Sequence, residues 1–137
     1  QFIERGESPS RSADISATVK TLKRVAARRR TLVVAAGDLA HVGPAFGDQY
    51  PVDFVGRAKL ASQDQRLIDI MSRGQAEDFF EEIRREDDQR HICGMPPIYI
   101  AQSVLSGVCG SSMGYAQCPA SEDGSSLVSI CGMIYHA

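Results

Sequence analysis

The sequence predicts a layered α/β or α+β fold. Apolar residues recur at helical spacing in four segments, and three shorter segments are apolar or alternating runs typical of strands. The chain has 137 residues, of which 43% are hydrophobic and 23% charged. These values suit a single domain with a substantial core. No apolar run is long enough to span a bilayer.

The first helix is expected to begin at Ser12 or Asp14, because both residue types cap helices well. Its apolar positions recur from Ile15 onward, and it is expected to end in Arg28–Arg30. The arginines suit the negative end of a helix dipole; the alternative is a phosphate-binding patch. Residues 1–30 hold 8 Lys and Arg against 3 Asp and Glu. No Trp is present and no aromatic residues alternate with the basic ones, so nucleic-acid binding is not expected.

Thr31–Ala36 is a continuous apolar run with the sequence Thr-Leu-Val-Val-Ala-Ala. It predicts a strand buried on both faces, as in a parallel sheet covered by helices. Gly37 ends this run, and residues 37–53, which are rich in glycine and proline, are expected to form a loop.

The rest of the chain alternates helical and strand-like segments. Further helices are expected over 57–72, over 75–87 and from Pro97 onward, and closing strands over 112–118 and 126–135. The second of these helices presents its acidic residues to solvent, with Glu81 and Arg85 paired four residues apart.

The best candidate for chemistry is the segment that directly follows the first expected strand, where ligands bind in open α/β sheets. It contains Asp38 and His41, three residues apart, so a helical turn would bring them to one face. A carboxylate bonded to one ring nitrogen prepares the other as an acid, a base or a ligand. The alternative is that Asp38 caps a turn and His41 is an ordinary loop histidine.

The four cysteines, at positions 93, 109, 118 and 131, contain no C-x-x-C pair, which excludes a zinc ribbon or a thioredoxin motif. We expect reduced thiols and a cytoplasmic protein, because a domain of this size does not need disulfides. His91 and Cys93 could ligate a metal across a turn, but a structural role is favoured. The sequence contains no P-loop, no dinucleotide-binding fingerprint and no G-x-S-x-G motif.

Three parts of the sequence, namely two short motifs and the pair of closing strands, resemble the MEMO family, also called AmmeMemoRadiSam system protein B. Gly37–Gly43 resembles its (G/S)D-x-x-H-x-G motif, and His91–Ile98 resembles its ICGxxPI motif. Tyr115–Cys118 and Ser125–Ser129 resemble its closing strands. The family's PHAGY and SHH-like segments, which belong to its N-terminal half, do not occur here.

The resemblance implies a three-layer α/β fold with a central mixed sheet flanked by helices, similar to that of the class III extradiol ring-cleavage dioxygenases. Residues 1–137 would form a single domain, the C-terminal portion of that dioxygenase-like fold. Those enzymes hold non-haem iron with two histidines and a carboxylate, and use another histidine as acid and base. By motif, Asp38 and His41 match the acid/base position. Cys118 is the nearest match to the cysteine that can ligate metal in MEMO proteins.

The resemblance also implies Fe(II) or another divalent metal in the full-length protein. This chain alone is expected to hold no metal tightly, because the family's two ligating histidines lie in the segments that are absent. Two other functions stay open: a partner-binding scaffold without catalysis, and an iron-dependent extradiol dioxygenase. The N-terminal half of the same protein, or another chain, is expected to cover an exposed sheet edge. A protein partner or a small-molecule ligand is expected, without nucleic acid or a membrane span.

Overall fold

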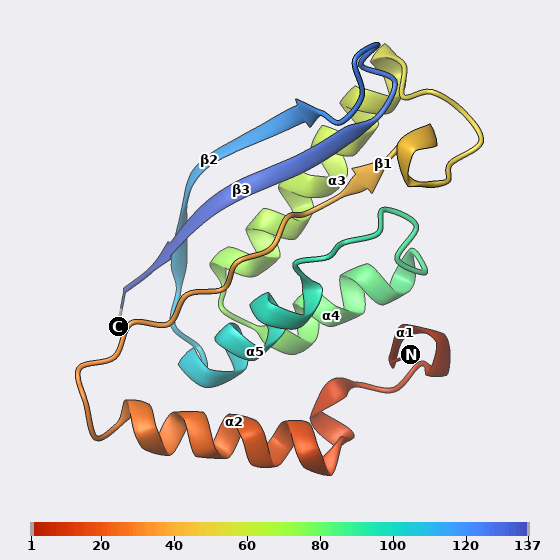
Figure 1. Cartoon of the computed structure of the whole chain (residues 1–137). Coiled ribbons are helices and arrows are strands. Elements are labelled where there is room, and N and C mark those ends of the chain that lie inside the picture. The colour runs from red at the N-terminus through yellow and green to blue at the C-terminus, as the bar shows by residue number, and fades with distance from the viewer. Residues whose placement is uncertain (1, 137) are drawn as a thin grey trace.

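The computed structural model describes residues 2–136, in which helices pack on a small antiparallel sheet (Figure 1). Its helices are α1 (Phe2–Arg5), α2 (Ala13–Ala26), α3 (Phe54–Ser72), α4 (Ala76–Arg85) and α5 (Met95–Leu105), with 3-10 helices η1 (Pro9–Arg11) and η2 (Pro44–Phe46). Its strands are β1 (His41–Val42), β2 (Gly110–Pro119) and β3 (Leu127–Tyr135). The α/β class expected from the sequence is confirmed.

The four helices expected from the apolar spacing are present, and side-chain caps mark where two of them begin. Ser12 caps α2 through its hydroxyl, and Asp53 caps α3 through its carboxylate. Because Asp53 provides this cap, α3 begins three residues before the expected start. α2 ends at Ala26, so Arg28–Arg30 lie beyond the helix and are exposed rather than forming its last turn.

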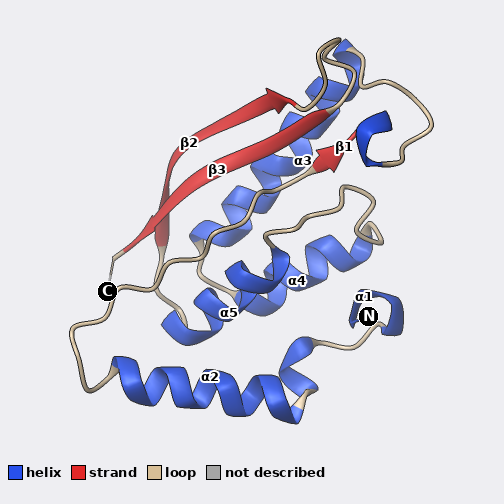
Figure 2. Ribbon diagram, in the orientation of Figure 1, coloured by secondary structure: helices blue, strands red, loops and turns tan. Residues whose placement is uncertain are grey.

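The strands form one sheet in the order β1–β3–β2, and both pairings are antiparallel. The two closing strands are confirmed, but the mixed sheet expected from the family resemblance is not found in residues 2–136. Figure 2 shows the strands on one side of the molecule and α2 farthest from them. The outer face of the hairpin carries exposed Met113, Ile130 and Ile134. The described part of the chain places no helix over that face, so its helices flank only one side of the sheet.

The prediction of a strand at Thr31–Ala36 is wrong, because this segment runs as an extended loop that forms no strand (Figure 1). The side chain of Leu32 is 86% exposed and that of Val34 is 75% exposed, so the run is not buried on both faces. A strand is stabilised by hydrogen bonds and side-chain pairs with a neighbour. Within residues 2–136, no other strand pairs with this segment.

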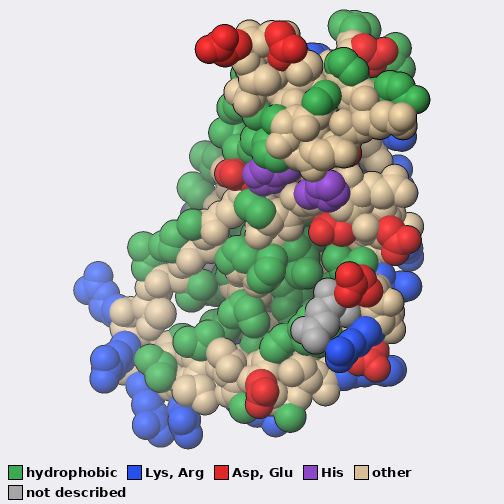
Figure 3. Space-filling model, turned by 45° about the vertical axis from the view of Figure 1, so that its right-hand side comes forward, with side chains coloured by type: hydrophobic (Ala, Val, Ile, Leu, Met, Phe, Trp, Pro, Cys, Tyr) green, Lys and Arg blue, Asp and Glu red, His purple; other side chains and the backbone are tan. Residues whose placement is uncertain are grey.

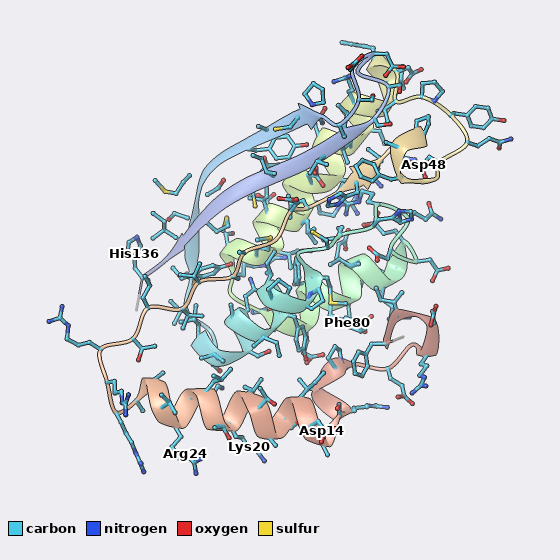
Figure 4. All side chains as sticks on the ribbon, in the orientation of Figure 1. Asp14, Lys20, Arg24, Asp48, Phe80 and His136 are labelled. Atoms are coloured by element: carbon cyan, nitrogen blue, oxygen red, sulfur yellow. The ribbon has the colours of Figure 1, made fainter. Side chains whose placement is uncertain are left out.

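The main core lies between the sheet and α3, α4 and α5. Phe80, labelled in Figure 4, is fully buried, and its ring meets that of Tyr99 edge-on with the centroids 6.2 Å apart. On the outer face of α4, Glu81 pairs with Arg84 at 2.7 Å, not with Arg85 as expected. Arg85 pairs instead with Glu82, so both pairs are three residues apart. No helix within residues 2–136 combines the length and apolar character needed to cross a membrane.

Candidate metal centre

Two chain segments that are distant in sequence meet backbone to backbone at the candidate site. A Cβ on Gly37 would lie 2.6 Å from the Cα of Gly94, and a Cβ on Gly94 would lie 2.5 Å from the carbonyl oxygen of Asp38. The N–H of Gly94 donates to that same oxygen at 2.8 Å. Only glycine permits so close an approach. The crossing therefore holds the loop before α5 against the segment that leads into β1.

Asp38, His41 and Cys93 come together at this crossing. Each offers one possible ligand atom, and these atoms all lie within 4.8 Å of one another. Metal–ligand bonds of about 2.0–2.3 Å place the ligands of one ion roughly 3–4 Å apart, so the cluster fits a single ion after small adjustments. A carboxylate, an imidazole and a thiol suit Fe(II), Zn(II) or copper better than Ca²⁺ or Mg²⁺. Asp38 and His41 are half-buried and Cys93 is exposed, so the cluster is reached from the surface.

The backbone sets the tautomer of His41. Its Nδ1 lies 3.1 Å from the carbonyl oxygen of His91, and a carbonyl can only accept, so we assign the proton to Nδ1. In the neutral ring, Nε2 is then free to accept a proton or bind a metal. Nε2 lies 3.7 Å from Oδ2 of Asp38. The sequence suggested that Asp38 would set the tautomer of His41, but in the structure the backbone carbonyl of His91 does so.

Cys93 is the cysteine that the structure adds to Asp38 and His41. Its Sγ accepts a hydrogen bond from the backbone N–H of Asp38 at 3.3 Å. Sequence reasoning favoured a structural role for Cys93, although it noted that His91 and Cys93 could bind a metal. The side chain of His91 is outside the cluster, to which the residue contributes only its backbone carbonyl.

Cys118 lies apart from this cluster, on β2 opposite Val128 of β3. It belongs to no group of three or more potential ligands among the residues that the structure describes. Its role as a metal ligand therefore stays a prediction. All four cysteines have free thiols, and Cys109 is exposed in the loop before β2.

A buried ion pair includes Arg90, whose backbone carbonyl accepts from the N–H of His41. The guanidinium of Arg90, whose side chain is 5% exposed, contacts the fully buried carboxylate of Asp64 and donates from Nε to Glu86 at 2.9 Å. The hydroxyl of Tyr115 donates to the other oxygen of Asp64 at 2.8 Å. Burial, aided by the charge of Asp64, raises the pKa of Tyr115, so its hydroxyl stays a donor. This pair was not predicted from the sequence. The available signal was that Asp64 occupies a position at helical spacing with the buried apolar residues of α3, such as Leu60 and Ile68.

Two buried serines, one in β3 and one in the turn before it, hold residues 40–45, which contain β1. The hydroxyl oxygen of Ser129 accepts from the N–H of Ala40, and that of Ser126 accepts from the N–H of Ala45, both at 2.9 Å. Farther along the loop, Asp48, labelled in Figure 4, accepts from the N–H of Gly43 at 2.6 Å. Side-chain oxygens therefore add to the backbone acceptors around the site, where the carbonyl of Ser129 accepts from Leu39 and that of Arg90 accepts from His41.

Comparison with known families decides the relationship. The chain matches the Memo-like protein family over residues 8–134. It belongs to the Memo-like protein family. The matched range includes Asp38, His41 and Cys93, as well as the Cys118 that the sequence singled out. Comparison with the curated proteins finds no match.

Proposed function

We propose that this Memo-like chain supplies one side of a metal centre, in a cleft like that of the extradiol dioxygenases. The observation that carries the proposal is the spacing of the ligand atoms of Asp38, His41 and Cys93, all within 4.8 Å. The spacing depends on two backbones in contact at glycines, so it does not rely on flexible side chains reaching together. With Cys93 as the ligand from this cluster, coordination positions stay open for further ligands or substrate.

Each of the three side chains takes a distinct role. The Cys93 thiolate is the soft ligand, in place of Cys118, and selects Fe(II), Zn(II) or copper. His41 is the acid/base group through Nε2, which lies 3.7 Å from the carboxylate of Asp38. A bound metal would supply a Lewis acid beside this pair. Tight binding is still expected to require the two further histidines that the family resemblance implies.

Cobalt titration tests the thiolate. Co(II) bound by a cysteine thiolate shows a ligand-to-metal charge-transfer band that other ligands do not give. We expect the band in the wild-type chain under reducing conditions, its retention in Cys109→Ser, and its loss in Cys93→Ser. His41→Ala and Asp38→Asn should each weaken the affinity for Co(II) by about 10-fold or more.

The Cys118→Ser variant distinguishes the two cysteines. Loss of the band in Cys118→Ser, with retention in Cys93→Ser, would return the ligand role to Cys118. If the wild-type chain shows no band at millimolar Co(II), or Cys93→Ser keeps it, the proposed centre is wrong.

Ring cleavage is a narrower form of the same proposal, and it is supported by the Asp38–His41 pair beside a candidate iron ligand. It predicts iron-dependent oxygen uptake with catechols by the full-length protein. His41→Ala should abolish that uptake while leaving part of the iron bound. No uptake across a panel of catechols would remove this activity and leave the metal centre itself untouched.

A further inference from the structure

A hollow separates β3 from the segment Thr31–Gly37. The two are joined at one end, where the N–H of Leu39 donates to the carbonyl of Ser129 at 2.8 Å. From there they diverge, and Figure 1 shows the segment in orange beside the dark blue strand. The hollow has a volume of about 540 Å³ and is lined by the segment, by Cys131 and Tyr135 of β3, and by α5. We call it the strand gap.

The β3 side of the strand gap presents unpaired backbone groups. In an antiparallel ladder, successive residues direct their N–H and C=O groups to opposite sides. Ser129 bonds toward β1, so Cys131, Met133 and Tyr135 direct their backbone groups the same way, into the gap. Within residues 2–136, none of these three has a backbone partner on that side.

The opposite side of the gap is also unpaired. Leu32–Gly37 makes no backbone–backbone hydrogen bond to any described residue. The segment is extended and consists of valine, leucine, alanine and glycine, and it continues directly into β1. It therefore offers a second unpaired run of backbone groups, separated from β3 by the gap. Open edges of this kind bind extended chains.

We propose that the strand gap receives an extended strand of about six residues from another polypeptide, paired with β3 on one side and with Leu32–Gly37 on the other. The two edges run in opposite directions, because the segment leads into β1 and β1 is antiparallel to β3. The inserted strand would be parallel to one edge and antiparallel to the other. The antiparallel sheet would then become mixed. This inference does not depend on the proposed metal centre.

The walls of the gap define the chemistry of the inserted strand. Met71, Ile98 and Leu105 form an apolar floor, so side chains that point inward are apolar. Outward-pointing side chains would lie beside the exposed Val34 and Ile134, which also favours apolar residues. Figure 3 shows hydrophobic side chains across the middle of the molecule in that view, with Lys and Arg gathered at the lower left.

Charge selects one end of the inserted strand. The exposed Arg28–Arg30 directly precedes Thr31, at the open end of the gap. An acidic residue at that end of the strand would be attracted to these arginines. The expected occupant is thus an apolar, β-branched strand with one acidic terminus.

Amide exchange with a synthetic strand tests the proposal. The probes are two eight-residue peptides of alternating valine and threonine, one with glutamate at its N-terminus and one at its C-terminus. We expect one peptide to slow amide exchange at least 10-fold at both Leu32–Gly37 and Cys131, Met133 and Tyr135. The same peptide with N-methylated backbone amides should not protect either edge. Protection of neither edge, or of only one, contradicts the proposal.

The free protein and two variants complete the test. Amide exchange at both edges should be fast without peptide. Slow exchange that does not depend on protein concentration would show that the two edges pair with each other, and slow exchange that does depend on it would show that a second copy fills the gap. Either result overturns the proposal. Neighbouring N–H groups of an extended segment point to opposite sides. Of the two variants Val33→Pro and Val34→Pro, one therefore removes an N–H that would donate to the inserted strand, and the other removes an N–H that points away from it. The variant that loses the donating N–H should bind the peptide at least 10-fold more weakly with an unchanged melting temperature. Undiminished binding by both variants contradicts the proposal.

Discussion

The backbone N–H of His41 donates to the carbonyl oxygen of Arg90 at 2.7 Å. The guanidinium of the same arginine is buried against Asp64, which has no exposed surface. One residue therefore links the candidate site to an ion pair behind it. The position of His41 depends on a charge pair that contacts neither the imidazole nor the thiol.

Removal of Asp64 should be strongly destabilising. Asp64→Ala leaves the Arg90 guanidinium buried with only Glu86 as a partner, and breaking a buried pair costs about 3–5 kcal/mol. Urea denaturation measures the loss in the free energy of unfolding. The control is Arg85→Ala, whose side chain is 73% exposed and whose pair with Glu82 should contribute under about 1 kcal/mol. Equal losses in both variants would show that the buried pair supports nothing.

Gly94→Ala should separate the two segments that meet at the site. The added methyl group would lie 2.5 Å from the carbonyl oxygen of Asp38, so Cys93 and Asp38 must move apart. We expect Co(II) affinity to fall at least 10-fold and the free energy of unfolding to fall by about 1–3 kcal/mol. Gly132→Ala is the control, because its methyl group would meet Met113 at an ordinary 3.6 Å. Unchanged cobalt affinity in Gly94→Ala would refute this role for the glycine.

The Cys131 thiol should react slowly. Burial, with a smaller contribution from the charge of Asp64, raises the pKa of Cys131 to about 11. Because the thiolate is the nucleophile, iodoacetamide at pH 8 should modify Cys131 at least about 10-fold more slowly than the exposed Cys109. Mass spectrometry of the peptides gives both rates. The difference should vanish in denaturant, and similar rates in the native protein would contradict the burial of this thiol.

Acid should weaken the loop between β2 and β3. Asp123 accepts hydrogen bonds from the N–H of Ser125 at 3.0 Å and from the hydroxyl of Ser121 at 2.7 Å, which lower the pKa of its carboxyl to about 2. The unfolded value is about 3.9, so the stabilisation is complete above that pH and is lost as the pH falls toward 2. The melting temperature should therefore fall less between pH 4 and 2 in Asp123→Asn than in wild type. Parallel acid limbs would disprove this contribution.

Periodicity was sufficient to predict the helices. Phe79, Phe80 and Ile83 mark the buried side of α4 at helical spacing, and the structure buries all three. The strand at Thr31–Ala36 could not be judged in the same way, because local sequence reports propensity, whereas a strand also needs a neighbour.

The candidate site was only partly predictable, because its contacts cross long distances in the sequence. Asp38 and His41 lie in one short motif and could be found together. Cys93 meets Asp38 across 55 positions, and Arg90 meets Asp64 across 26, so no local pattern reports either contact. The available signal was a glycine beside each site segment, Gly37 and Gly94, where two backbones touch.

The hydroxyl of Ser126 holds η2, whereas backbone hydrogen bonds hold the segment that contains His41. Ala45 donates to the side chain of Ser126, while Leu39 and His41 donate to the carbonyl oxygens of Ser129 and Arg90. Because one side-chain contact is weaker than a set of backbone bonds, η2 can open locally without breaking the bonds that fix His41. A ligand could enter and leave on the timescale of a loop while the sheet beneath it stays intact.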